Sequence, residues 1–221
     1  MSRRAVVCLV ALACVSSGAP AQSPPPVVAK RTEAPAAFTA ISPIFSQLVM
    51  LSYPAGFTVV NEKAMGDRYI REAVPAGQGL GGWSEMITVT GAKGLAANPN
   101  ATPQRFVEQI ASGFKQACPE TFSLKGYGAS KIGDHDAFVG WIGCGAVTAA
   151  GASRSESTLI LAIKGSADIY TIQWAERGPA EAKPLDADDT KWLGRLQRLG
   201  PLKVCPVVPG ESAPYPSCIN R

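Results

Sequence analysis

The chain has 221 residues, of which 46% are hydrophobic and 17% are charged, a composition typical of a globular protein with a single core. Its 21 basic and 17 acidic residues give a formal charge of +4, which is too small to indicate nucleic-acid binding. A single histidine and the absence of any C-x-x-C motif argue against a zinc site.

The first 21 residues have the three-part layout of a secretory signal peptide. Two arginines supply positive charge, residues 5–15 form an uninterrupted apolar run, and Ala19 and Ala21 form a small-x-small cleavage site. The run is shorter than the roughly 20 apolar residues that span a bilayer. We therefore expect cleavage after Ala21, a periplasmic or secreted product with no transmembrane helix, and a formal charge of +2 once both arginines are removed.

A second processing route stays open at Cys14. Residues 11–14 read Ala-Leu-Ala-Cys and resemble a bacterial lipoprotein box, although Leu12 stands two residues before the cysteine rather than three. Acylation of Cys14 would tether the protein to a membrane surface as an envelope lipoprotein. Cleavage after Ala21 would instead release a soluble exported protein.

Four cysteines lie beyond the signal peptide: Cys118, Cys144, Cys205 and Cys218. An even number in an exported chain indicates disulfides, and four cysteines allow three pairings. Cys205 and Cys218 flank a proline-rich segment, and a bridge closing a loop of about 15 residues contributes on the order of 3 kcal/mol. We therefore favour Cys205 with Cys218, which leaves Cys118 with Cys144 and makes residues 205–221 a disulfide-closed tail.

Residues 22–37 are rich in proline and alanine and have no apolar period, which predicts a flexible linker before a domain at 38–204. Alternating hydrophobicity and turn residues predict four strands in the first half of the domain. They lie at 47–54, 57–64, 67–74 and within 82–94.

Gly77, Gly79 and Gly82 match the pattern G-x-G-x-x-G. A dinucleotide-binding loop needs a strand before these glycines and a helix after them, because the helix N-terminus holds the pyrophosphate. Here a predicted strand follows the glycines. We interpret this stretch as a connection between two antiparallel strands.

An amphipathic helix follows, with Thr102 as its N-cap, Pro103 at its first position and Pro119 after its end. Four more strands are predicted at 122–132, 137–147, 157–165 and 168–178, and a last helix at about 187–199, capped by Asp186. This order predicts an α+β fold, in which one antiparallel sheet of about eight strands packs with two amphipathic helices.

Two stretches carry a resemblance to a known family. The sequence LSYPAGF at 51–57 resembles an opening strand, turn and aromatic residue, and KIGDHDAFVGWI at 131–142 resembles a central hairpin. Together with the element order, they resemble the PsbP-like/DcrB-like α+β sandwich of exported accessory proteins. The resemblance implies a binding or accessory module, with no catalytic residues.

Four residues are candidate contacts with a ligand or partner: Trp83, Asp134, His135 and Asp136. His135 between two aspartates could act as a base or a metal ligand, but the same composition is typical of a solvated turn. Trp83 adjoins the glycine-rich stretch and could be exposed, whereas the other three tryptophans lie on apolar periods and are predicted core residues.

The sequence contains no G-x-S-x-G, H-E-x-x-H or P-loop motif. We therefore expect a periplasmic binding or envelope accessory module that recognises an envelope protein or a small ligand, without a cofactor, rather than an enzyme. The alternative is a carboxylate-dependent hydrolase acting on cell-wall glycans. A hydrolase requires a cleft with two carboxylates about 5 to 9.5 Å apart. A binding module requires an apolar patch or a pocket without such a pair.

Overall fold

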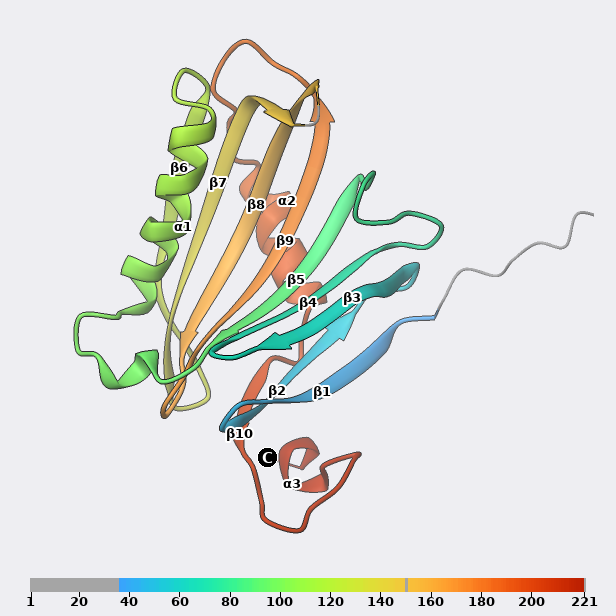
Figure 1. Ribbon diagram of the computed structural model, residues 1–221, viewed down its shortest axis with the longest axis vertical. Coiled ribbons are helices and arrows are strands. Elements are labelled where there is room, and N and C mark those ends of the chain that lie inside the picture. Colours follow the sequence, from blue (N-terminus) through green and yellow to red (C-terminus); the bar gives the residue numbers. More distant parts are fainter. Residues whose placement is uncertain (1–35, 150, 221) are drawn as a thin grey trace, which may run out of the picture. The chain divides into compact units, whose positions relative to one another are not determined.

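The computed structural model describes residues 36–149 and 151–220, so the predicted signal peptide and Cys14 lie outside the described residues. The larger sheet runs, in spatial order, β3 (Phe57–Met65), β4 (Arg68–Pro75), β5 (Glu85–Ala92), β9 (Ile169–Pro179), β8 (Ala152–Lys164), β7 (His135–Ala149) and β6 (Phe122–Ile132). The smaller sheet runs β1 (Phe38–Ile44), β2 (Gln47–Tyr53) and β10 (Lys203–Pro206). The helices are η1 (Leu95–Ala97), α1 (Pro103–Ala117), α2 (Asp189–Arg198) and α3 (Pro216–Ile219), as Figure 1 shows.

The prediction of an α+β fold with one sheet of about eight strands is wrong. Of the described residues, 51% lie in strands and 17% in helices, and the strands form two antiparallel sheets of seven and three. The two strands that the sequence did not reveal, β1 and β10, flank β2 and contain Pro43 and Pro206. Proline is tolerated on edge strands, where its missing N–H is not needed. These strands are therefore defined by their pairing with β2 and not by a local pattern.

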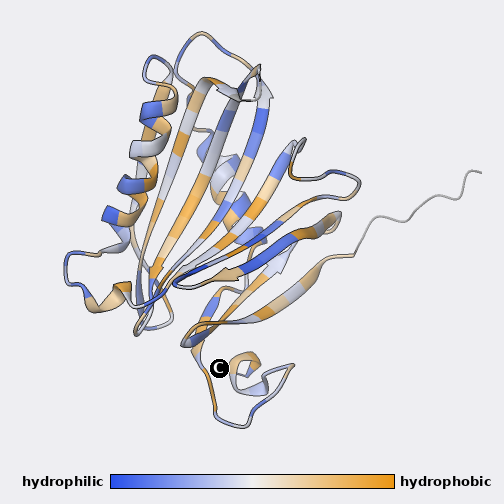
Figure 2. Ribbon diagram, in the orientation of Figure 1, coloured by the Kyte–Doolittle hydropathy of each residue, from blue (hydrophilic) through white to orange (hydrophobic). Residues whose placement is uncertain are grey.

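One face of the larger sheet forms the main core with β2 and α2. Leu159 and Leu161 of β8 point to this face, as does Trp174 of β9, and they meet Val49 of β2 and Trp192 of α2. All five side chains are at most 2% exposed. Because burying such a side chain contributes about 1.5 to 3 kcal/mol, this core accounts for much of the driving force for folding. Figure 2 shows hydrophobic positions along the middle of β7 and β8.

Helix α1 covers the opposite face of the larger sheet at β6, β7 and β8, and leaves β3, β4 and β5 uncovered on that side (Figure 1). Val107 and Ala111 pack against Ile142 and Ile160. The Thr102 hydroxyl accepts a hydrogen bond from the backbone N–H of Arg105 at 3.2 Å, which caps the first turn as the sequence predicts. No helix among the described residues has the length and apolar character needed to cross a membrane.

The four cysteines of the described residues lie in two disulfide pairs, the same pairs that the sequence favours. Cys118, at the end of α1, is bonded to Cys144 of β7, so the helix is tied to the sheet. Cys205 of β10 is bonded to Cys218 of α3, and this pair packs with Leu48 and Met50 on the outer face of β2. As a result β2 is buried on both faces, which explains its nearly continuous apolar sequence.

Candidate functional site

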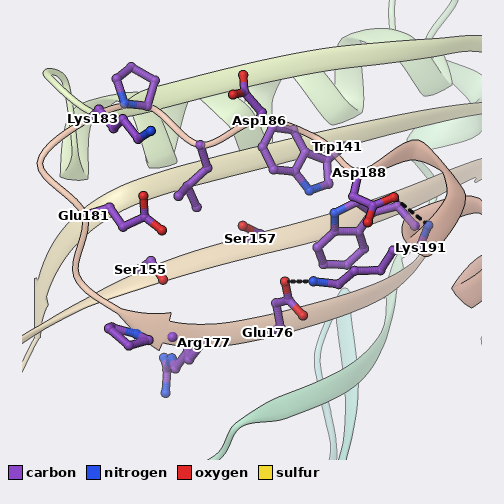
Figure 3. Close-up of a pocket in the computed structure, with 15 residues that line it drawn as sticks. Trp141, Ser155, Ser157, Glu176, Arg177, Glu181, Lys183, Asp186, Asp188 and Lys191 are labelled. Carbon is purple, nitrogen blue, oxygen red and sulfur yellow. Dashed lines mark hydrogen bonds and ion pairs between the residues drawn. The ribbon is translucent and has the colours of Figure 1, made fainter.

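A cleft of about 420 Å³ lies where β9 leads into α2. Its floor is formed by Trp141 of β7, Ser155 and Ser157 of β8, and Glu176 of β9. Residues 180–188, here called the wall segment, connect β9 to α2 and form one side of the cleft (Figure 3). The volume lies within the range of about 300 to 1,000 Å³ that is common for small-ligand pockets.

Gly145 of β7 determines where the wall segment lies. The backbone N–H of Glu181 donates to the Gly145 carbonyl at 2.8 Å. A Cβ on Gly145 would stand 2.1 Å from the carbonyl oxygen of Lys183 and 2.7 Å from that of Glu181. No side chain fits there, because both obstacles are backbone atoms. Glycine is therefore required for this side of the cleft to form.

The start of α2 differs from the prediction in a way that affects the cleft. The predicted cap, Asp186, is wrong: the N-cap is Asp188, whose carboxylate accepts from the backbone N–H of Lys191 at 3.0 Å. The helix then begins at Asp189. Asp186 is left as an exposed residue of the wall segment and lines the cleft.

A network of ion pairs fixes the carboxylate of Glu176. It contacts the ammonium group of Lys191 and lies 2.8 Å from the guanidinium of Arg195. Arg195 is only 8% exposed and also pairs with Glu85. Its guanidinium carbon lies 4.6 Å from the ring centre of Trp192, a cation–π contact. Glu176 is therefore ion-paired with two cations and serves the structure of the cleft.

Three buried polar side chains on the cleft have no hydrogen-bond partner among the described residues: Ser155, Ser157 and Trp141. They are 9%, 5% and 2% exposed, respectively. The indole nitrogen of Trp141 is buried without an acceptor, whereas the hydroxyl oxygens of the two serines are not fully buried and open to the cleft. Buried polar groups are nearly always paired, and leaving one unpaired costs about 1 to 3 kcal/mol. The cleft therefore offers one buried donor and two accessible hydroxyls that no group in the described part of the chain pairs.

The rim of the cleft carries charges that are not ion-paired. Glu181, Lys183 and Asp186 are exposed and form neither an ion pair nor a side-chain hydrogen bond within the described residues. Asp188 is exposed as well and contacts only the backbone N–H that it caps. Figure 3 shows Glu181, Asp186 and Asp188 spaced along the wall segment and Glu176 on strand β9.

Trp83, a predicted contact residue, lies beside the cleft without lining it. The guanidinium carbon of Arg177 stands 3.5 Å from the centre of the Trp83 ring, and the same guanidinium donates to Glu156 at 2.9 Å. Arg177 lines the cleft. Strand β5 follows the glycine-rich stretch, so this region is a strand connection as expected. A ligand role for Trp83 stays a prediction.

The other three candidates lie elsewhere. Asp134 and His135 line a second cavity of about 560 Å³ beside β10. There the buried side chain of Gln47 lies 3.3 Å from the His135 ring nitrogen and accepts from the backbone N–H of Ser166 at 2.8 Å. In this cavity the Gln47 side chain thus pairs with His135 and with the backbone of Ser166.

Asp136 is exposed and pairs with Lys131 at 2.8 Å. The four predicted residues therefore do not form one site, and the roles proposed for Asp134, His135 and Asp136 stay predictions. No group of three or more His, Cys, Asp or Glu residues in the described part of the chain could hold a metal ion.

Sequence reasoning missed the cleft because its residues come from three strands, a loop and a helix. One signal was available: residues 176–191 mix acidic and basic side chains with prolines where a predicted strand leads into a predicted helix. Such a pattern is typical of an ordinary solvated loop. Only the buried serines and the tryptophan beneath it distinguish it from one.

Neither a scan against protein-family models nor a search among curated proteins finds a match. The chain is similar to a solved structure of LpqN, described as involved in cell envelope biogenesis of Mycobacterium tuberculosis. The TM-score is 0.37 and the identity 10%, over 77% of this chain and 92% of that chain. A likeness this weak transfers neither a fold nor a function, and the PsbP-like/DcrB-like resemblance stays a prediction.

Proposed function

We propose that this chain is an exported binding module whose cleft between the wall segment and strands β7 to β9 holds a small polar ligand. The observation that carries the proposal is a set of polar groups at the cleft without protein partners: the hydroxyls of Ser155 and Ser157 and the buried indole N–H of Trp141. The hydroxyls open to the cleft and can bond to water or to a ligand. The buried indole N–H lacks an acceptor in the described residues, and a ligand group that reached it would supply one.

Binding accounts for the cleft better than glycan hydrolysis does. The cleft does contain carboxylates, but a glycosidase needs one carboxyl that is kept protonated by a buried, apolar setting. Glu176 is instead ion-paired with Lys191 and Arg195. The remaining three acidic groups, Glu181, Asp186 and Asp188, are exposed to solvent.

Export is the second part of the proposal. It is supported by the N-terminal signal-peptide pattern and by the two disulfide pairs, because disulfides persist in oxidising compartments. The intact mass of the protein isolated from an expressing bacterium tests it. A chain that begins after Ala21 and carries two disulfides is expected. An added diacylglycerol at Cys14 would show the tethered form, and an unprocessed chain with free thiols would contradict export.

The binding test uses the indole N–H resonance of Trp141 and the backbone amides of the wall segment as reporters in isotope-labelled protein. A panel of saccharides, amino acids, small amines and short peptides is titrated. At least one class of compound is expected to shift these resonances and to raise the melting temperature as its concentration rises. Compounds that bind but shift only residues of the second cavity would contradict the proposal.

Ser157→Ala separates a binding role from a structural one. Removing a hydroxyl that lacks a protein partner should leave the free energy of unfolding unchanged or slightly higher, while weakening ligand binding about tenfold. Ser112→Ala is the matched control, because Ser112 is an exposed serine on α1 that bonds only within its own helix. It is expected to leave binding unchanged.

A further inference from the structure

The charges around the cleft indicate which class of ligand it takes, an inference that rests on the proposed function. We propose that the ligand is a small organic cation, an amine or guanidinium compound that also carries hydroxyl or carbonyl oxygens.

Some charged side chains of the cleft are ion-paired within the protein, and others are not. Glu176 pairs with Lys191, and Arg177 pairs with Glu156. Three carboxylates, those of Glu181, Asp186 and Asp188, then face one ammonium group, that of Lys183, with no ion pair among them. The cleft therefore has an excess of unpaired negative charge in a chain whose formal charge is +4.

The three carboxylates are separated from one another. Figure 3 shows Glu181, Asp186 and Asp188 spaced along the wall segment rather than converging on one point. They are not close enough to form a metal-binding group among the described residues. Separated carboxylates along one side of a cleft of about 420 Å³ suit an extended organic cation better than a bare metal ion.

The floor of the cleft adds a second requirement, which concerns hydrogen-bond acceptors on the ligand. The indole N–H of Trp141 is buried and is a donor only, so a ligand group that pairs with it must be an acceptor. An ammonium group has donors and no acceptor, which means that a simple alkylamine would leave Trp141 unpaired. The hydroxyls of Ser155 and Ser157 can pair with either kind of group. A ligand that satisfies both the rim and the floor therefore combines a cation with oxygen acceptors.

The experiment compares ligands that differ only in the charged group. D-glucosamine is paired with D-glucose, ethanolamine with ethylene glycol, and 4-amino-1-butanol with 1,4-butanediol. Each is titrated into isotope-labelled protein at about pH 6, where amines are protonated, and at low salt. In at least one pair the amine should shift the Trp141 indole and wall-segment resonances with a dissociation constant at least tenfold below that of its neutral partner. Added salt should weaken that binding.

Charge variants are expected to change amine binding in opposite directions, which misfolding would not do. Asp186→Asn and Glu181→Gln should each weaken amine binding about threefold to tenfold, whereas Lys183→Gln should strengthen it, because it removes the unpaired cation. The matched control is Asp67→Asn, an exposed carboxylate in the turn between β3 and β4. It changes the total charge equally and should leave binding unchanged.

The outcomes distinguish this inference from the proposed function. Equal shifts of the cleft resonances by the charged and neutral members of every pair would overturn the cationic ligand and leave the binding cleft standing. If no compound of these pairs or of the wider panel shifts the cleft resonances, both proposals fail. Weaker amine binding in Lys183→Gln would also overturn the inference.

Discussion

The two ends of the β8–β9 hairpin treat buried polar groups in opposite ways. At the turn, the carboxylate of Asp168 is 1% exposed and accepts hydrogen bonds from the Ser46 hydroxyl at 2.6 Å, the Gly94 N–H at 2.8 Å and the Tyr170 hydroxyl at 3.2 Å. At the other end, the hydroxyls of Ser155 and Ser157 have no hydrogen-bond partner within the described part of the chain and open to the cleft. At the turn end, Asp168 and its three donors form a structural hydrogen-bond network, here called the clamp. At the cleft end, the hydroxyls lack protein partners, as is expected of a binding site.

The largest expected effect is on the clamp. Asp168→Ala removes the acceptor shared by three segments of the chain and leaves their donors buried and unpaired. We expect the free energy of unfolding to fall by about 3 kcal/mol or more, measured by urea denaturation at neutral pH. Asp67→Ala, an exposed carboxylate, should change it by less than about 0.5 kcal/mol. A loss below about 1 kcal/mol in Asp168→Ala would mean that the clamp is not structural.

The charge of Asp168 should also make stability depend on pH. Burial opposes ionisation, but the hydrogen bonds from Ser46, Gly94 and Tyr170 outweigh it and hold the pKa of Asp168 below its ordinary value. A carboxyl with a lowered pKa stabilises the fold above the unfolded-state pKa of about 3.9, and this contribution is lost as the pH falls through the folded-state pKa. The stability difference between the natural protein and Asp168→Asn should therefore be largest near neutral pH and shrink below about pH 4. A stability difference that grows as the pH falls would contradict a lowered pKa for Asp168.

At the cleft end, Gly145→Ala should displace the wall segment, because its Cβ would collide with the carbonyl oxygens of Lys183 and Glu181. We expect a loss of about 1 to 3 kcal/mol in the free energy of unfolding and altered amide resonances for residues 180–188. The control is Gly113→Ala on α1, where a Cβ would meet nothing within 4 Å. If both variants retain the same wall-segment spectrum, Gly145 does not position this side of the cleft.

The smallest effects test the comparison most directly, with the same substitution at both ends. Ser46→Ala removes a charge-assisted hydrogen bond to Asp168 and should cost about 1.5 kcal/mol of unfolding free energy. Ser157→Ala removes a hydroxyl with no partner and should cost nothing or stabilise the protein by a fraction of that amount. Equal losses in the two variants would show that Ser157 is paired in solution and would remove one support of the binding site.

The periodic elements were predictable because each carries a local signal. The alternation in Ile87, Thr88, Val89 and Thr90 separates the core face of β5 from the opposite face, and the capped apolar pattern after Thr102 gives α1. The short strands β1 and β10 were not predictable. Each has a proline and little periodicity, and each exists because it pairs with β2 across the chain. Long-range pairing of this kind leaves no trace in a local window.

The sequence by itself determined the strands from β2 to β9, the two longer helices and the favoured cysteine pairs, because periodicity, capping and loop closure are local or nearly local properties. Only the tertiary structure decided that the strands form two stacked sheets and that a charged loop lies over two unpaired serines and a buried indole. The physical reason is that burial and hydrogen-bond satisfaction depend on residues far apart in the chain. The same serines would be ordinary surface residues if the wall segment lay elsewhere.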